Sequence, residues 1–168
     1  NLSSKYIFDE IICLPHLSKK IIVSIFNSSF APGAFSDKNK HLNFLIALND
    51  LLETDLIKNN DIVFLIKGKY PLRKYHELND IDLSYNIDKI LASNRIIEVE
   101  EKISSTAMIK ISSIVISMAY TSTCVEALMM GKKAIYFDWN VSYPDSAFQK
   151  FENLVASNST ELFVFFKY

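Results

Sequence analysis

"SSIVISMAYTSTCVEALMMGKKAIYFD" (residues 112–138) contains two apolar runs with a helix-like segment between them. The runs are residues 114–118 and 134–137, and Gly131 stops the segment that separates them. A short run that is apolar throughout is typical of a strand buried on both faces, and a helix between two such strands indicates a parallel crossover. Small hydroxyl residues, Thr121 to Thr123, form the turn from the first run into the helix. The stretch therefore predicts a strand–helix–strand unit of a parallel sheet.

The same alternation continues on both sides of this unit. We expect further strands at residues 20–26, 61–66 and 95–100, and a short sixth strand at residues 153–157. Leucine and phenylalanine recur at helical spacing over residues 44–56, and the C-terminal segment also fits a helix. The pattern predicts a doubly wound, Rossmann-like α/β domain with a parallel sheet of five to six strands and helices on both faces. Residues 1–18 fit least, so we expect a connecting segment there and the domain over residues 19–168.

Composition narrows the class of protein. The 168 residues suffice for one domain, 49% of them are hydrophobic, and the formal net charge is −1. Basic residues are spread along the chain, whereas a nucleic-acid surface needs them clustered on one face. Two cysteines and three scattered histidines predict neither a disulfide framework nor a metal site. We therefore expect a cytoplasmic protein that binds no nucleic acid and uses no metal or other cofactor.

Two interpretations of the turn at Thr121 to Thr123 stand side by side. In doubly wound sheets, ligands bind where strands end and helices begin, and backbone N–H groups with added hydroxyls suit a phosphate. The chain has only three glycines, so neither a GxGxxG nor a Walker A loop is available to hold that phosphate. Alternatively, Thr123 and Glu126 form a capping box that only starts the helix. A glutamate in an otherwise apolar helix favours function, but the spacing alone leaves both interpretations open.

"IVISMAYTSTCVEALMMGKKAIYFD" (residues 114–138) resembles the strand–helix–strand signature in the C-terminal, nucleotide-sugar-binding half of GT-B glycosyltransferases. Such domains show an apolar strand, a Ser/Thr or Gly turn, a Glu-Ala-Leu helix, then Gly-Lys and a strand that ends near Asp. The resemblance is greatest to bacterial surface-polysaccharide enzymes, including transferases of Kdo-like sugars from CMP donors. It follows the strand order over residues 20–162 and is specific in residues 114–138.

The resemblance implies roles for individual residues. Thr121, Ser122 and Thr123 would bind the donor phosphate, and Glu126 would accept hydrogen bonds from ribose hydroxyls. The other implied donor-binding residues are Ser28 and Ser29 after the first strand, Lys67 and Lys69 after the second, and Asp138 after the fifth. The two lysines could equally be solvated loop residues, and Asp138 could only cap the next turn. No catalytic residue is assigned.

The resulting hypothesis is a donor-binding domain of a glycosyltransferase in bacterial surface polysaccharide biosynthesis, with Kdo or a related sugar transferred from a CMP donor. The implied partners are the nucleotide sugar, an N-terminal acceptor-binding half, and a saccharide or lipid-linked acceptor. We expect the chain to be part of a larger enzyme and to be inactive alone. The full-length enzyme would be peripheral to the inner membrane. The alternatives are a nucleotide-sugar 2-epimerase-like domain and a non-catalytic nucleotide-binding or interaction module.

Overall fold

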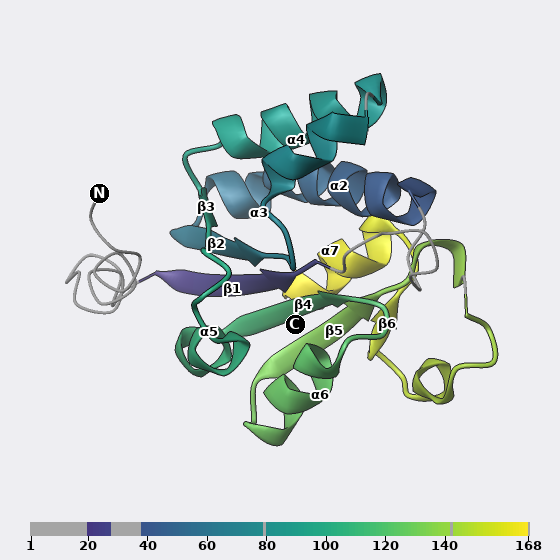
Figure 1. Ribbon diagram of the computed structural model, residues 1–168. Coiled ribbons are helices and arrows are strands. Elements are labelled where there is room, and N and C mark those ends of the chain that lie inside the picture. The colour runs from purple at the N-terminus through teal and green to yellow at the C-terminus, as the bar shows by residue number, and fades with distance from the viewer. Residues whose placement is uncertain (1–19, 28–37, 79, 142, 168) are drawn as a thin grey trace.

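The computed structural model describes residues 20–27, 38–78, 80–141 and 143–167. Its single sheet has six parallel strands in the order β3-β2-β1-β4-β5-β6 (Figure 1). The strands are β1 (Ile21–Phe26), β2 (Ile62–Lys67), β3 (Ile96–Glu98), β4 (Ile114–Met118), β5 (Lys133–Phe137) and β6 (Val155–Ala156). The prediction of a doubly wound α/β fold is confirmed. The predicted connecting segment 1–18, and the candidate residues Ser28 and Ser29, lie outside the described residues.

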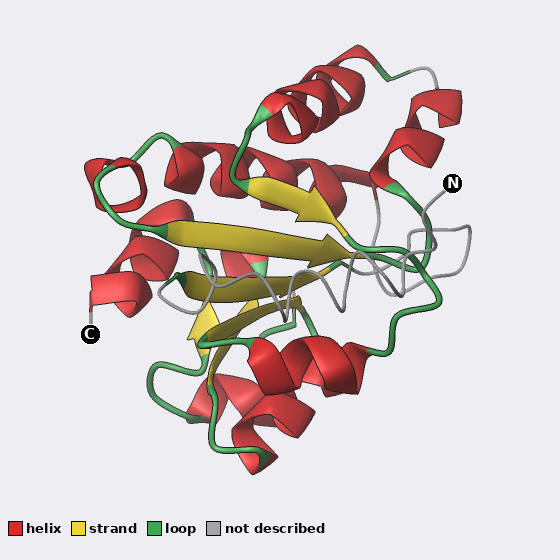
Figure 2. Cartoon of the chain, turned by 90° about the vertical axis from the view of Figure 1, so that its left-hand side faces the viewer, coloured by secondary structure: helices red, strands yellow, loops and turns green. Residues whose placement is uncertain are grey.

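Helices cover both faces of the sheet, which lies between two helical layers in Figure 2. On one face lie α2 (Lys38–Leu52), α4 (Ile81–Ala92) and α7 (Ser159–Lys167), and on the other lie α5 (Ser105–Ile111) and α6 (Ser122–Met129). The shorter elements are α3 (Asp55–Lys58), η1 (Leu72–Leu78), η2 (Trp139–Val141) and η3 (Ala147–Lys150). Among these helices, none combines the length and apolar character that a membrane span requires.

Each face of the sheet has its own hydrophobic core, because successive side chains of a strand point in opposite directions. Val23 and Ile25 of β1 belong to the core beneath α2, α4 and α7, whereas Phe26 belongs to the core beneath α5 and α6. These side chains are almost fully buried. The apolar runs noted in the sequence therefore pack on both sides, as buried parallel strands do.

The predicted helix over residues 44–56 is divided in two, which corrects that expectation. α2 ends at Leu52, and Thr54 then starts α3, with its side chain accepting a hydrogen bond from the Ile57 N–H at 3.4 Å. A threonine that caps the following turn takes an extended backbone, here with a ψ of 148°, so the first helix cannot continue through it. The leucine periodicity continued across this break and did not indicate it.

The strand order places a topological switch point between β1 and β4. The chain passes from β1 outward to β2 and β3, returns to β4 on the other side of β1, and continues outward to β5 and β6. In the register of the sheet, Phe26 pairs with Lys67 on one side and with Ser117 on the other. The residues that follow these three strands therefore lie together at the carboxyl ends of the strands, where ligands of this fold class bind.

Candidate functional site

The turn from β4 into α6 leaves the first backbone amides of the helix without a side-chain cap. Thr121 is the N-cap residue, with φ −84° and ψ 153°, and its side chain makes no capping hydrogen bond. The Thr123 Oγ1 atom instead lies 2.9 Å from Thr121 Oγ1 and 2.8 Å from Ser117 Oγ. The peptide bond between Ala119 and Tyr120 is cis. Uncapped N–H groups at a helix start, beside hydroxyl groups, can bind an anion.

The capping-box interpretation of Thr123 and Glu126 is wrong. The helix begins at Ser122, two residues before the predicted start at Cys124, so Thr123 already lies within the first turn. Its hydroxyl is engaged by Ser117, which is fully buried at the end of β4. A buried hydroxyl is almost always hydrogen-bonded, and Thr123 supplies that partner.

Glu126 is held by a neighbouring helix. Its Oε1 atom accepts a hydrogen bond from the Thr106 hydroxyl of α5 at 2.5 Å. Glu126 lies three residues after Thr123 and four after Ser122, which places all three on one face of α6. Its side chain is partly exposed. The structure thus brings Thr121, the two first-turn residues and Glu126 together, and it adds Thr106, which sequence reasoning missed.

Asp138 anchors the segment that follows β5. It is 3% exposed, and its Oδ2 atom accepts hydrogen bonds from the Tyr120 hydroxyl at 3.0 Å, the Gln149 amide at 3.3 Å and the Tyr143 backbone N–H at 3.3 Å. Burial, together with the hydrogen bond to Asp138, raises the pKa of Tyr120 to about 12, so the phenol stays protonated near neutral pH. These contacts fit the structural alternative for Asp138.

An aromatic cluster supports the same region. The Tyr120 ring lies 4.9 Å from the Tyr136 ring and 5.3 Å from the Phe148 ring, measured between centroids. The Tyr136 hydroxyl donates to the Thr121 carbonyl at 2.8 Å. The turn is therefore held in place by Tyr136 of β5, which bonds its backbone, and by Phe148 of η3, which packs on Tyr120. The aromatic residues after β5 were visible in the sequence, but their partners were not.

The candidate lysines at and after the end of β2 contact other groups. Lys67 Nζ donates to the carbonyls of Glu101 at 2.7 Å and Glu100 at 3.3 Å, in the loop after β3. Burial lowers the pKa of Lys67. Lys69 Nζ lies 5.6 Å from the centroid of the Tyr70 ring. Among the hydrogen bonds and ion pairs of the described residues, none joins either lysine to the α6 turn.

Asn27 contributes a buried polar group at the switch point. It follows β1, is 6% exposed, and its Nδ2 atom lies 3.3 Å from Nε2 of His41, which is fully buried. Burial lowers the pKa of His41 to about 4, so the ring is neutral at physiological pH. The Asn27 Oδ1 atom has no hydrogen-bond partner within the described part of the chain. A buried acceptor without a partner is uncommon in folded proteins.

The protein is thus a doubly wound α/β domain, and the uncapped N-terminus of α6 lies beside its topological switch point. Residues 26–166 match the model of the family described as "Polysaccharide biosynthesis PFTS motif protein", and the chain belongs to that family. The matched range includes the whole strand–helix–strand unit of β4, α6 and β5.

Solved structures confirm the fold. The C-terminal CMP-Kdo binding domain of WaaA from Acinetobacter baumannii matches with a TM-score of 0.55 and 10% identity, over 99% of this chain and 89% of that chain. The wall teichoic acid polymerase TagF matches with a TM-score of 0.60 and 18% identity, over 99% of this chain and 39% of that chain. A putative UDP-N-acetylglucosamine 2-epimerase from Listeria monocytogenes matches with a TM-score of 0.53 and 14% identity, over 91% of this chain and 37% of that chain.

These identities establish a shared fold and nothing finer. The chain spans about two fifths of the TagF and epimerase chains. A comparison with curated protein sequences gave no match. The fold and the polysaccharide-biosynthesis context inferred from residues 114–138 are therefore confirmed, and the individual site residues stay predictions.

Proposed function

We propose that this chain is the donor-binding domain of a glycosyltransferase in polysaccharide biosynthesis, and that the donor phosphate binds at the start of α6. The observation that carries the proposal is the uncapped first turn of α6, lined by Thr121, Ser122 and Thr123 at the carboxyl end of β4. Family membership supports the biosynthetic context. The similarity in fold to the CMP-Kdo binding domain of WaaA supports a nucleotide sugar as the ligand class.

The helix start would stabilise negative charge on the leaving phosphate. The aligned peptide dipoles of α6 place partial positive charge at its N-terminus, and the free N–H groups point toward an incoming anion. Donors fixed before the reaction stabilise developing charge without reorganisation. In this proposal no metal is needed. Among the described residues, no group of three or more His, Cys, Asp and Glu is placed to hold one.

Glu126 would bind the ribose. A carboxylate accepts hydrogen bonds through both oxygens, and Thr106 occupies only Oε1. The Thr106 hydroxyl would hold the carboxylate in a fixed orientation, so that Oε2 faces the two ribose hydroxyls.

The remaining parts of the hypothesis extend to the whole enzyme. We infer an N-terminal half that binds a saccharide or lipid-linked acceptor, a Kdo-like sugar on a CMP donor, and a cytoplasmic enzyme at the inner membrane. The epimerase match keeps nucleotide-sugar 2-epimerisation as the second candidate. Incubation of the full-length protein with UDP-N-acetylglucosamine, followed by sugar analysis, separates the two reactions, because only an epimerase converts the donor without an acceptor.

A charge introduced at the first helical residue tests the phosphate site. In Ser122→Asp, the new carboxylate interacts favourably with the helix dipole, so the melting temperature should stay the same or rise. The same charge would repel a phosphate, and calorimetric titration with CMP, UDP and GDP should show an affinity loss of about tenfold or more.

The matched control is Ser113→Asp. Ser113 is also an exposed serine, but it lies at the amino end of β4, whereas the α6 turn follows the carboxyl end of that strand. This variant should keep the nucleotide affinity of the wild type. Equal affinity in the wild type and in both variants would refute the phosphate site.

A further inference from the structure

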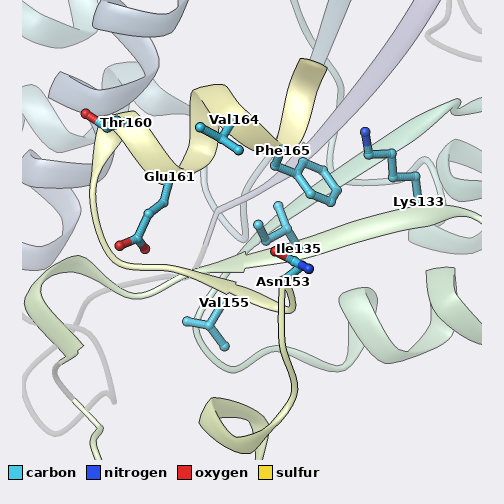
Figure 3. Close-up of a pocket in the computed structure, with 8 residues that line it drawn as sticks. All are labelled: Lys133, Ile135, Asn153, Val155, Thr160, Glu161, Val164 and Phe165. Carbon is cyan, nitrogen blue, oxygen red and sulfur yellow. The ribbon is translucent and has the colours of Figure 1, made fainter. Parts of the chain in front are cut away.

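A pocket of about 460 Å³ lies along the outer edge of the sheet, between α7 and strands β5 and β6 (Figure 3). This volume is in the range of sites that hold small organic ligands. β6 pairs only with Tyr136 and Phe137 of β5, so among the described residues the first half of β5 has no strand on its outer side. α7 runs beside this part of the edge, and the pocket forms between them.

The walls of the pocket are mainly apolar. They are formed by Ile135 of β5, Val155 of β6, and Val164 and Phe165 of α7. Val164 is 44% exposed, so an apolar ligand would remove water from a side chain that folding leaves half-exposed. Removal of apolar surface from water favours binding in proportion to the area covered.

The two charged side chains of the pocket lie at its opposite ends and differ in their hydrogen bonding (Figure 3). Glu161 accepts hydrogen bonds from the Ser157 N–H at 2.7 Å, the Ser157 hydroxyl at 2.9 Å and the Asn158 amide at 2.9 Å. These donors come from the residues that precede α7. Glu161 therefore stabilises the start of α7, and its oxygens are largely occupied.

Lys133 has a different environment. Its Nζ atom lies 4.5 Å from the centroid of the Phe165 ring, and among the ion pairs of the described residues none includes it. Burial lowers its pKa, in agreement with a partly desolvated ammonium group. The pocket therefore combines an apolar wall with one cation that lacks an anionic partner in the described part of the chain.

We propose that this pocket binds an amphiphilic carboxylate, with the carboxylate at Lys133 and an alkyl chain against Val164 and Phe165. The site is separate from the nucleotide site proposed above. α7 packs on the face of the sheet opposite α6, and no residue that lines the pocket belongs to the α6 turn. Occupation of the pocket would therefore leave the α6 turn free.

A titration with two probes of equal chain length tests the sign of the charge. Decanoate and decylammonium, each below its micelle concentration, would be titrated into the wild-type protein and followed by methyl NMR. We expect saturable shifts at Ile135, Val155 and Val164 with decanoate, and binding of decylammonium at least about tenfold weaker.

Two variants test the assignment to Lys133. Lys133→Met keeps the apolar stem and removes the charge, and it should weaken decanoate binding about fivefold, as expected for a partly exposed ion pair. Lys132→Met is the matched control, because the Lys132 ammonium donates to the Lys110 carbonyl at 2.8 Å and does not line the pocket. Val164→Asp provides a second test on a half-exposed wall residue and should also weaken decanoate binding.

Three results would overturn the proposal. They are equal affinity for the two probes, the absence of saturable binding by decanoate, and wild-type decanoate affinity in both Lys133→Met and Val164→Asp. If Lys133→Met fails to fold, Val164→Asp alone decides. Nucleotide affinity, measured with and without decanoate, should be unchanged, which keeps this test independent of the α6 site.

Discussion

The first turns of α5 and α6 start with similar hydroxyl residues but use their backbone amides differently. In α5, the Ser104 hydroxyl accepts a hydrogen bond from the Ala107 N–H at 3.0 Å. In α6, the Thr121 side chain makes no such bond and instead lies against the Thr123 hydroxyl. In α5 a side chain thus caps the N-terminus, whereas the first backbone amides of α6 can bind a group from outside the chain.

The cause of the difference lies in the strand before α6. Ser117, the second-last residue of β4, is fully buried and draws the Thr123 hydroxyl into a hydrogen bond at 2.8 Å. Thr123 in turn bonds to Thr121, whose side chain is then turned away from the helix amides. The residue type at a helix start therefore does not by itself determine whether the helix is capped. The polar groups of the preceding strand decide it here.

The largest expected effect comes from Glu126, which faces α5 from the second turn of α6. In Glu126→Gln, one carboxylate oxygen is replaced by an amide group that cannot accept from a ribose hydroxyl. We expect nucleotide affinity to fall by roughly 1.5–3 kcal/mol, or about 10- to 150-fold, with little change in the melting temperature. Calorimetric titration with the nucleotide and its 2′,3′-dideoxy analogue provides the measurement.

The dideoxy analogue should bind the wild type weakly and lose little further affinity in the variant. Thr106→Val sharpens this test, because it removes the donor that orients Glu126 and keeps the carboxylate. Its effect on affinity should be smaller than that of Glu126→Gln. If a folded Glu126→Gln protein binds the nucleotide as the wild type does, the ribose role is wrong.

The second effect, of similar size, is a loss of stability in acid that arises at His41 of α2, beside Asn27. The pKa of His41 is about 4 in the folded protein and 6.5 as an unperturbed group, so between these values the unfolded chain binds more protons. Stability is therefore complete above pH 6.5 and is lost as the pH falls toward 4. From pH 7.5 to pH 5, the expected loss is about 2 kcal/mol.

Urea unfolding at the two pH values would measure this loss in the wild type and in His41→Gln. The variant should lose less stability than the wild type over the same interval, whatever its stability at pH 7.5. An identical loss in both proteins would show that His41 does not titrate as described. Because of this effect, the two helix starts are best compared above pH 7.

The smallest expected effect compares the two caps directly. Ser104→Ala removes a side-chain cap and should lower the free energy of unfolding by about 1 kcal/mol. Thr121→Ala removes no cap, so its cost should stay below about 0.5 kcal/mol. Urea unfolding of both variants without nucleotide provides the measurement. Equal losses would mean that the Thr121 side chain caps α6 in solution.

Most of the fold could be predicted from the sequence, because strands and helices are indicated by residue patterns within short segments. The longer apolar runs, such as residues 114–118, became buried strands, whereas the predicted strands at residues 95–100 and 153–157 are shorter and less buried in the structure. The hydroxyl turn lies where a strand ends and a helix begins. The two helix starts show the limit of this reasoning. A cap depends on which acceptor reaches the amides, and the contact between Ser117 and Thr123 was not specified by their spacing.

Contacts between distant segments could not be predicted. Thr106 and Glu126 are twenty residues apart and meet only because α5 packs on α6. Asp138 is buried because the segment after β5 folds back, so that Gln149 reaches it. For Lys67, the position after a strand suggested an anion site, but the side chain extends to carbonyls of the loop after β3. Side-chain direction requires the tertiary structure.

The most direct test of the account is an amide NMR titration of the wild-type protein with CMP, UDP and GDP. We expect at least one nucleotide to shift the N–H signals of Ser122, Thr123 and Cys124 at the start of α6. The Ala107 N–H of α5, which Ser104 already binds, should stay unshifted in the same spectra. Unchanged α6 signals with all three nucleotides, or equal shifts at the two helix starts, would contradict a phosphate site at the uncapped helix.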